Sequence, residues 1–328
     1  KTASILAATL VLGACSGMTN IPERDEYAQP KWYSNCVESG ASGYFWWKQE
    51  YAFACGAGES RYQQAAEEQM YAIAMNNFAK RINGRVNSET KISFKNDVKN
   101  KTLDENAIKK IGFPLVDSVV QRSLVATGGT VLASKLALNY GIACNTAGGS
   151  HHANYDGGAG YCVFNDVAVA AHYLLDRGFA NRILIVDLDV HQGNGNSDIF
   201  KDNRHVFTFS MHSKTNYPAK KSISDLDVEL EDNLEDETYI KTLKYYLNEL
   251  SNENFDFIFY IAGVDIHFND RLGKLNISDD GVKQRDELVI ENFSSKKIPI
   301  CGVLGGGYNK DFNKLVELHS ILHRSCAK

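Results

Sequence analysis

Residues 183–195, Ile-Leu-Ile-Val-Asp-Leu-Asp-Val-His-Gln-Gly-Asn-Gly, are the stretch that decides the fold of this chain. An apolar run leads directly into carboxylates, an imidazole and a Gly-Asn-Gly turn. A continuous apolar run of this kind is typical of a strand buried on both faces of a parallel sheet. Because open α/β sheets bind ligands beyond the carboxyl ends of their strands, the polar residues stand where a functional site is expected.

Asp187, Asp189 and His191 occupy alternate positions, so on an extended strand their side chains point the same way. One imidazole with carboxylate oxygens suits a divalent transition metal, and a metal with three protein ligands keeps a position open for water. The alternative is a buried strand end whose aspartates cap the next helix. These residues alone do not decide between the two interpretations.

The composition is that of a globular protein. The chain has 328 residues, of which 44% are hydrophobic and 23% charged, enough for one large domain or two small ones. A net charge of −5 and a pI of about 6.0 indicate neither a nucleic-acid-binding surface nor a polybasic membrane patch.

The N-terminal part differs from the rest of the chain. All nine histidines lie at position 151 or later, while all three tryptophans lie before position 50. Residues 1–15 combine a basic start with a short apolar stretch ending in Leu-Gly-Ala-Cys15, which resembles a bacterial lipoprotein signal with Cys15 as the lipidation site. Residues 16–98 resemble small envelope lipoproteins of the LPP20 type, with a helix expected at 59–82 and a strand at 85–95.

The seven cysteines follow the same division. Cys36 and Cys55 would pair as a disulfide if their segment is exported, but the sequence leaves this pairing open. Cys144, Cys162 and Cys301 lie in apolar or strand-like contexts and are expected to be buried free thiols. The absence of a Cys-x-x-Cys pair argues against a thiolate zinc site.

From residue 104 onward, strand and helix patterns alternate. This alternation predicts βαβ units and a parallel sheet. The expected strands are 141–147, 183–190, 206–212, 227–231, 255–263 and 299–306, and the expected helices include 114–140, 165–177, 195–201, 235–252 and 279–296.

Reactive groups follow three more of the expected strands. His151 and His152 come after strand 141–147, Asp265 comes after 255–263, and Tyr308 comes after 299–306. Each has an ordinary explanation by itself, as a surface histidine pair, a helix cap or a core tyrosine. Together at successive strand ends they favour a single site at the carboxyl edge of the sheet.

Residues 104–328 resemble the zinc-dependent histone deacetylase family, which includes acetylpolyamine amidohydrolases and acetoin-utilisation proteins. The matching segments, in the family's order, are GGSHHA, GYCVFND, DLDVHQGNG, FSMH, AGVD and GGGY. Gln192, Asn194 and the RLGKLNIS stretch at 271–278 are closest to the class IV and bacterial branch. The resemblance implies an α/β, arginase/deacetylase-like parallel sheet flanked by helices, N-terminally truncated because lipoprotein-like sequence replaces the family's first two strands.

The resemblance also implies a role for each site residue. An amide carbonyl is a poor electrophile, so its hydrolysis needs a Lewis acid, a proton acceptor and a donor to the developing oxyanion. The resemblance implies that Asp189, His191 and Asp265 bind zinc (alternatively Fe²⁺), that His152 is the general base with His151 as its partner, and that Tyr308 donates to the oxyanion. It further implies that Asp187, Ser210 and Met211 surround a structural potassium ion and that Asn194 lies beside the base. Gly160 and Tyr161 would line the substrate tunnel.

The sequence therefore predicts a zinc-dependent amidohydrolase that acts on an acylated lysine peptide or an acylated polyamine. One rival is an envelope lipoprotein fused to an inactive deacetylase remnant, through a chimeric gene or an assembly product. Another is a binuclear arginase-like hydrolase, for which residues 183–195 lack the extra carboxylates. No nucleic-acid partner is predicted, and the membrane is contacted only through a lipid at Cys15. The N-terminus predicts an envelope location, whereas the family is usually cytoplasmic.

Overall fold

The computed structural model describes residues 42–44, 50–52 and 89–327. The chain divides into two compact units, residues 1–85 and 86–328. In the first unit, β1 (Ser42–Tyr44) pairs in antiparallel fashion with β2 (Glu50–Ala52). The signal-like segment with Cys15, the expected helix at 59–82, the Cys36–Cys55 pair and most of the LPP20-like region lie outside the described residues.

The second unit contains a six-stranded sheet in the order β3-β8-β7-β4-β5-β6, and every neighbouring pair is parallel. This confirms the predicted parallel α/β architecture. The strands are β3 (Ile142–Cys144), β4 (Ile183–Asp187), β5 (Val206–Ser213), β6 (Leu226–Leu230), β7 (Phe257–Ile261) and β8 (Ile300–Val303).

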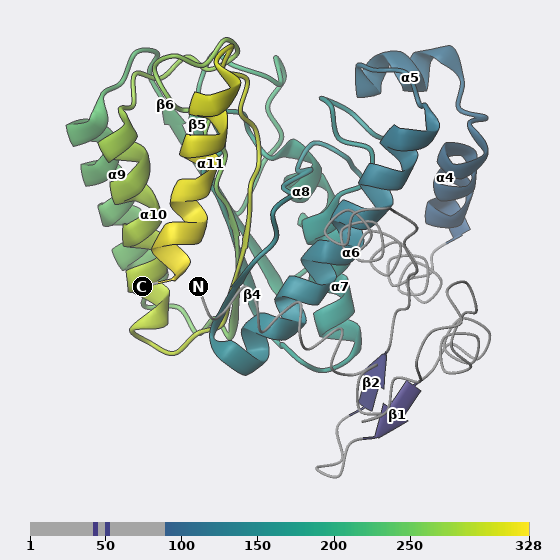
Figure 1. The fold of residues 1–328 in the computed structure, drawn as a ribbon. Helices are drawn as coiled ribbons and strands as arrows, with labels where there is room; N and C mark the ends of the chain where they lie inside the picture. The colour runs from purple at the N-terminus through teal and green to yellow at the C-terminus, as the bar shows by residue number, and fades with distance from the viewer. Residues whose placement is uncertain (1–41, 45–49, 53–88, 328) are drawn as a thin grey trace, which may run out of the picture. The chain divides into compact units, whose positions relative to one another are not determined.

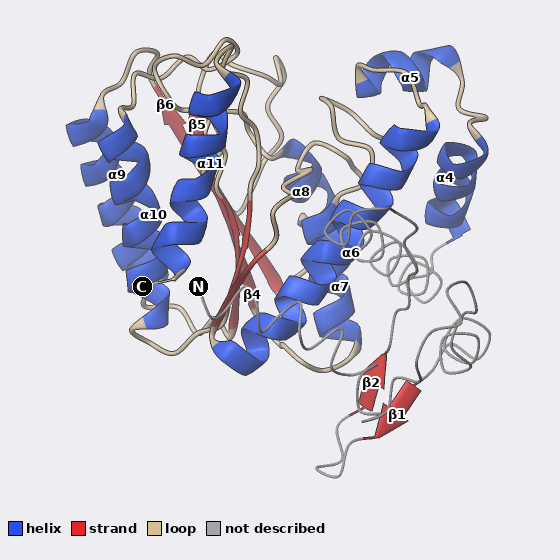
Figure 2. Ribbon diagram, viewed as in Figure 1, coloured by secondary structure: helices blue, strands red, loops and turns tan. Residues whose placement is uncertain are grey.

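Helices cover both faces of this sheet (Figures 1 and 2). One layer contains α6 (Asp117–Tyr140), α7 (Asp166–Asp176) and α8 (Asn194–Phe200), and the other contains α9 (Asp236–Leu250), α10 (Asp279–Ser294) and α11 (Phe312–Cys326). Every residue of β4 and β7 is buried, which explains why these strands read as unbroken apolar runs. Among the described residues, no helix is both long and apolar enough to cross a membrane.

Two further helices precede α6, and one of them corrects a prediction. The strand expected at 85–95 is wrong over its described part, because α4 (Glu89–Asn100) is helical there. Phe94 and Val98, four residues apart, are both buried, and the Phe94 ring packs edge-on against Phe164 at 6.0 Å. The segment is therefore helical because residues four apart share one face of a helix, and burial of these two outweighs the short alternation of apolar and polar residues that predicted a strand.

The second of these helices is the short α5 (Glu105–Ile111). The Asp104 side chain caps it by accepting from the Ala107 backbone N–H, and Gly112 ends it with a φ of 94°. α4 and α5 belong to the same compact unit as the sheet, which begins at Val86. The boundary expected between the lipoprotein-like region 16–98 and the region 104–328 stays a prediction. α4 extends across residue 98 to Asn100.

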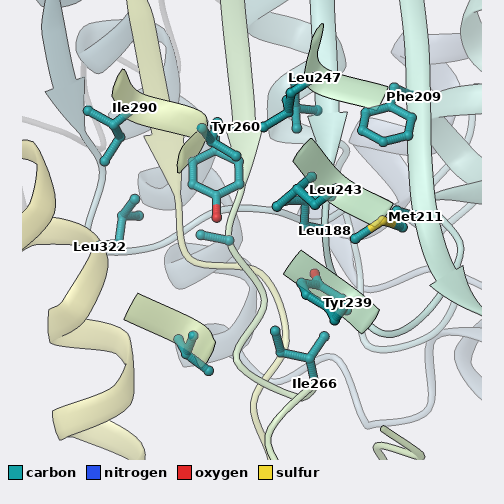
Figure 3. Packing of buried hydrophobic residues seen from close by; sticks show 14 of the residues in the cluster. Leu188, Phe209, Met211, Tyr239, Leu243, Leu247, Tyr260, Ile266, Ile290 and Leu322 are labelled. Carbon is teal, nitrogen blue, oxygen red and sulfur yellow. The ribbon is translucent and has the colours of Figure 1, made fainter. Parts of the chain in front are cut away.

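A buried apolar cluster lies between the sheet and the layer formed by α9, α10 and α11 (Figure 3). Leu243 and Leu247 of α9 extend toward Leu188 and Phe209 in this cluster, and all four side chains are buried. The Tyr239 and Tyr260 side chains share the cluster, and the Tyr260 hydroxyl donates to Asp286 Oδ1 at 2.5 Å.

Replacing Leu243 with Ala is expected to lower the free energy of unfolding by about 2–5 kcal/mol, because the cavity forms in a fully buried layer. Urea denaturation followed by circular dichroism measures this change. Lys244→Ala, at an exposed position of the same helix, is the matched control and should change stability little. Equal losses for the two variants would contradict this placement of the core.

Candidate active site

Three predicted metal ligands meet at the carboxyl edge of the two central strands. Asp189 and His191 follow β4, Asp265 follows β7, and these strands are hydrogen-bonded neighbours. The His191 Nδ1 atom lies 3.0 Å from Asp189 Oδ1 and 3.1 Å from Asp265 Oδ2. Within residues that the structure describes, this is the single group of at least three His, Cys, Asp or Glu side chains with metal-binding geometry.

The charges of these residues fit a metal cation. Burial, together with the nearby Asp189 charge, raises the pKa of Asp265 to about 7. Burial opposes a charged imidazole at His191, yet the hydrogen bonds to Asp189 and Asp265 raise its pKa to about 10. Two buried carboxylates thus require a positive charge between them, which a divalent ion coordinated by the same atoms would supply.

Backbone groups hold the carboxylates in place. The Gly306 N–H donates to Asp189 Oδ2 at 2.6 Å, and the Val190 N–H donates to Asp265 Oδ1 at 2.9 Å. A Cβ atom at position 306 would collide with the Asp265 carboxylate, so this close approach requires glycine. The donor set is therefore oriented by the fold itself, as metal sites require.

The two histidines predicted to act together are in direct contact. His151 Nε2 lies 3.1 Å from His152 Nε2, and both rings are buried. On their far sides, His151 Nδ1 lies 2.7 Å from Asp187 Oδ2, and His152 Nδ1 lies 2.8 Å from Asn194 Oδ1. The structure thus brings His151, His152, Asp187 and Asn194 into one chain of hydrogen bonds.

Different partners give the two imidazoles opposite pKa shifts. Burial alone would disfavour a charged His151, but the carboxylates of Asp187 and Asp189 raise its pKa to about 9. At His152, burial and the neighbouring charge of His151 lower the pKa well below its usual value. A neutral imidazole therefore lies beside a protonated one, and the pair can both accept and donate a proton.

A network that sequence reasoning missed holds the loop carrying these histidines. The buried Asp166 carboxylate accepts from the Thr130 hydroxyl at 2.5 Å and from the backbone N–H groups of Gly149 and Ser150 at 3.1 and 2.8 Å. Asn165 donates to Ala153 O at 3.0 Å on the other side of the pair. The Asn-Asp sequence at the start of α7 is the signal that would have found it.

Tyrosine rings surround the histidines and the carboxylates. The Tyr308 ring lies 6.2 Å from His191 and 6.1 Å from Tyr161. Tyr217, which the sequence analysis missed, packs edge-on against His152 at 4.7 Å. No motif or strand end marks Tyr217, because it stands in an irregular segment after β5.

The predicted tunnel residues Gly160 and Tyr161 lie beside this aromatic group. Gly160 has a φ of 53°, and a Cβ there would come within 2.5 Å of His152 Cδ2. The end of α5 supports the segment, since Gly160 N–H donates to Lys110 O at 3.0 Å and Tyr161 N–H donates to Ile111 O at 2.8 Å. Tyr161 is 53% exposed and so reaches the outer end of the site.

The residues of the predicted potassium site are close in the sheet. Asp187 of β4 is in register with Ser210 of β5, and Met211 follows Ser210 on the same strand. Ser210 Oγ lies 2.9 Å from His212 Nδ1. These residues are neighbours in the sheet, and potassium binding stays a prediction.

A buried arginine lies behind the three candidate metal ligands. Arg285, fully buried on α10, donates to the carbonyl oxygens of Leu188 at 3.4 Å, Ala262 at 3.4 Å and Gly263. Its Nε also donates to Asp286 Oδ1 at 2.9 Å. The bonded carbonyls lie just before Asp189 on one strand end and Asp265 on the other. Arg285 is therefore a positioning residue, and sequence reasoning missed it because an Arg-Asp pair in a helix resembles a solvated charge pair.

Replacing Arg285 with Met is expected to weaken Zn²⁺ binding by about 10- to 100-fold, because the two ligand-bearing strand ends lose their common donor. Competition with a chromophoric chelator measures the affinity. Val289→Ala, one turn further along α10 and equally buried, should reduce stability while leaving Zn²⁺ affinity unchanged. If both variants bind Zn²⁺ as the unmodified chain does, Arg285 has only a structural role.

Comparison with known proteins gives the family. A profile of the histone deacetylase domain matches residues 49–320, most of the chain. This chain belongs to the histone deacetylase family. The match begins inside the segment 16–98, whose resemblance to LPP20-type lipoproteins stays a prediction.

Several relatives resemble this histone deacetylase family member. An uncharacterized protein of Picosynechococcus is 49% identical over 225 residues, which is 68% of this chain and 75% of that protein. Histone deacetylase 2 of Arabidopsis thaliana is 37% identical over 58% of this chain and 50% of its own length. Acetoin utilization protein AcuC of Staphylococcus aureus is 28% identical over 58% of this chain and 52% of its own length. The chain thus spans about half the length of the last two relatives.

Solved structures share the fold. A crystal structure of an HDAC homologue in complex with SAHA has a TM-score of 0.62 at 22% identity, covering 78% of each chain. The HDA15 HD domain has a TM-score of 0.54 at 23% identity, covering 64% of this chain and 62% of that one. These matches confirm the predicted arginase/deacetylase-like fold.

Proposed function

We propose that this chain is a zinc-dependent deacetylase that hydrolyses the amide bond of an acylated lysine or a related acylated amine. The observation that carries the proposal is the buried Asp189–His191–Asp265 group beside the His151–His152 pair. Membership of the histone deacetylase family supports the reaction class. The HDAC homologue solved with SAHA supports an acylated amine as the substrate class.

Zinc held by Asp189, His191 and Asp265 would act as a Lewis acid toward the carbonyl and bring the pKa of a water ligand toward neutrality. One imidazole with two carboxylates also accepts Fe²⁺, so metal analysis of the purified protein decides the identity of the ion. We also propose a structural potassium ion beside Asp187, Ser210 and Met211.

The residues around the metal ligands carry the proton transfers. His152 is neutral and takes the proton of the attacking water, while Asn194 fixes the orientation of its ring. His151, which the Asp187 carboxylate holds in its charged form, supplies a proton for the leaving amine. Asp187 thus keeps acid and base in separate protonation states on adjacent residues.

Tyr308 stabilises the charge that develops on the carbonyl oxygen. Burial and the nearby carboxylate of Asp189 raise the pKa of Tyr308 above its usual value, so the hydroxyl keeps its proton and can donate it in a hydrogen bond. The aromatic rings of Tyr161, beside Tyr308, and of Tyr217, beside His152, suit the apolar stem of an acyl-lysine or acyl-polyamine chain.

The rival interpretation, an inactive remnant fused to an envelope lipoprotein, requires a defective site. The predicted catalytic and metal-binding side chains, together with the Asp187 that contacts His151, instead lie close together. They are His151, His152, Asp187, Asp189, His191, Asp265 and Tyr308. Lipid attachment at Cys15, and with it an envelope location, is a separate proposal that intact mass measurement of the protein from membranes would test.

The purified chain is expected to bind Zn²⁺ and to release acetate from an acetyl-lysine peptide. Chelator treatment should abolish turnover and added Zn²⁺ should restore it, while Asp189→Ala should lose both metal binding and activity. Elemental analysis and an acetate-release assay measure these outcomes. A folded, Zn²⁺-loaded chain that fails on both acetyl-lysine peptides and acetylated polyamines would refute the proposed activity.

Replacing Tyr308 with Phe is expected to lower kcat by about 10²- to 10³-fold, because one donor to the developing oxyanion is lost. Zn²⁺ affinity should be unchanged, since the tyrosine is not among the proposed ligands. Steady-state kinetics beside Zn²⁺ titration separates the two effects. A Tyr308→Phe variant with full kcat would remove this residue from the mechanism.

A further inference from the structure

Two cysteines that are far apart in the sequence meet beside the edge strand of the sheet. Cys144 ends β3, Cys326 ends α11, and their Sγ atoms lie 2.9 Å apart across a sequence separation of 182 residues. Both are free thiols, and both are partly exposed. The sequence analysis expected Cys144 to be a buried free thiol; the structure leaves it free but only partly buried, and places the Cys326 thiol beside it.

The surroundings make room for this pair and separate it from the other described cysteines. Gly302 of β8 is in register with Cys144, and a Cβ there would lie 3.0 Å from the Cys144 sulfur. Cys301 precedes Gly302 and so points to the opposite face of the sheet, where its sulfur lies 3.8 Å from Thr130 O. Cys162 contacts the Gly160 carbonyl oxygen at 3.5 Å and is also separate from the pair.

The two thiols differ in acidity. The hydrogen bond with Cys326 outweighs burial and, with neighbouring His323, lowers the pKa of Cys144 to about 6. The contact with Cys144, together with burial, raises the pKa of Cys326. At neutral pH, Cys144 is therefore a thiolate beside a protonated thiol, and a partly exposed thiolate is the reactive form of cysteine.

We propose that Cys144 and Cys326 form an oxidation site at which a hydroperoxide converts the thiol pair into a disulfide. The Cys144 thiolate attacks the terminal peroxide oxygen, the O–O bond breaks, and a sulfenic acid and an alcohol form once the alkoxide takes up a proton. The Cys326 sulfur then attacks the Cys144 sulfur, forming the S–S bond and releasing water. The two thiols lose two electrons and two protons, and the hydroperoxide is reduced to an alcohol and water.

The disulfide would fasten together two elements that lead to the active site. β3 is one of the two outer strands of the described sheet, is paired only with β8, and continues into the loop that carries His151 and His152. α11 begins shortly after Tyr308. Cross-linking their ends closes a long loop, which reduces the conformational freedom of the unfolded chain and stabilises the folded one.

The test uses the full chain, reduced, desalted and then treated with hydrogen peroxide. Peptide mapping without reductant should show the Cys144 peptide joined to the Cys326 peptide, with the loss of two hydrogen atoms, and dithiothreitol should reverse the change. The melting temperature of the oxidised chain should rise by about 5–10 °C. This outcome does not depend on deacetylase activity, so the two proposals fail independently.

Single cysteine-to-serine variants test whether Cys144 and Cys326 are the two cysteines that are linked. Cys144→Ser and Cys326→Ser should each abolish both the cross-link and the rise in melting temperature, whereas Cys301→Ser should retain both. If Cys301→Ser fails to fold, the mapping of the unmodified chain still decides, because it identifies the linked peptides directly. Oxidation that links Cys144 or Cys326 to a different cysteine, or that takes Cys144 to sulfinic acid without a link to Cys326, would overturn the proposal.

Discussion

The structure depends on placing two carboxylates and an imidazole, all buried, at the adjoining ends of its two central strands. Asp189 and Asp265 cannot both be charged there unless a cation lies between them, and the His191 Nδ1 atom points at both. The buried Arg285 donates hydrogen bonds to the backbone carbonyls that precede Asp189 and Asp265. The sheet, the Gly306 N–H that donates to Asp189, and Arg285 together hold the two carboxylates close despite their mutual repulsion.

The same buried charge organises the proton chemistry. Asp187, two residues before Asp189, holds a proton on His151, and burial together with that charge keeps His152 neutral. A single short stretch of sequence therefore provides two of the proposed metal ligands and influences the protonation of both histidines. Under the proposed function, substituting either of its carboxylates would change metal binding and proton transfer together, so its residues act as a unit.

The sequence predicted a feature well when residues close together in the sequence determine it, and poorly when the feature depends on contacts with distant residues. The buried strands β4 and β7 and the amphipathic helices were predictable because their patterns reflect two covered faces and a helical repeat. The strand expected at 85–95 failed because the short alternation there does not show that Phe94 packs against Phe164 of a distant segment, on the same helical face as the buried Val98. Tyr217 and Arg285 were missed for a similar reason, since each contacts residues distant in the sequence.

The sequence by itself determined the parallel sheet, the edge at which the site lies and the chemical kinds of its residues, because a strand end fixes which side chains share a face. Only the tertiary structure decided which groups are in contact: His151 with His152, Arg285 with the strand-end carbonyls, and Cys144 with Cys326. Sheet order and helix packing create those contacts. These contacts depend on which strands and helices become neighbours, and the local pattern of apolar and polar residues does not specify this.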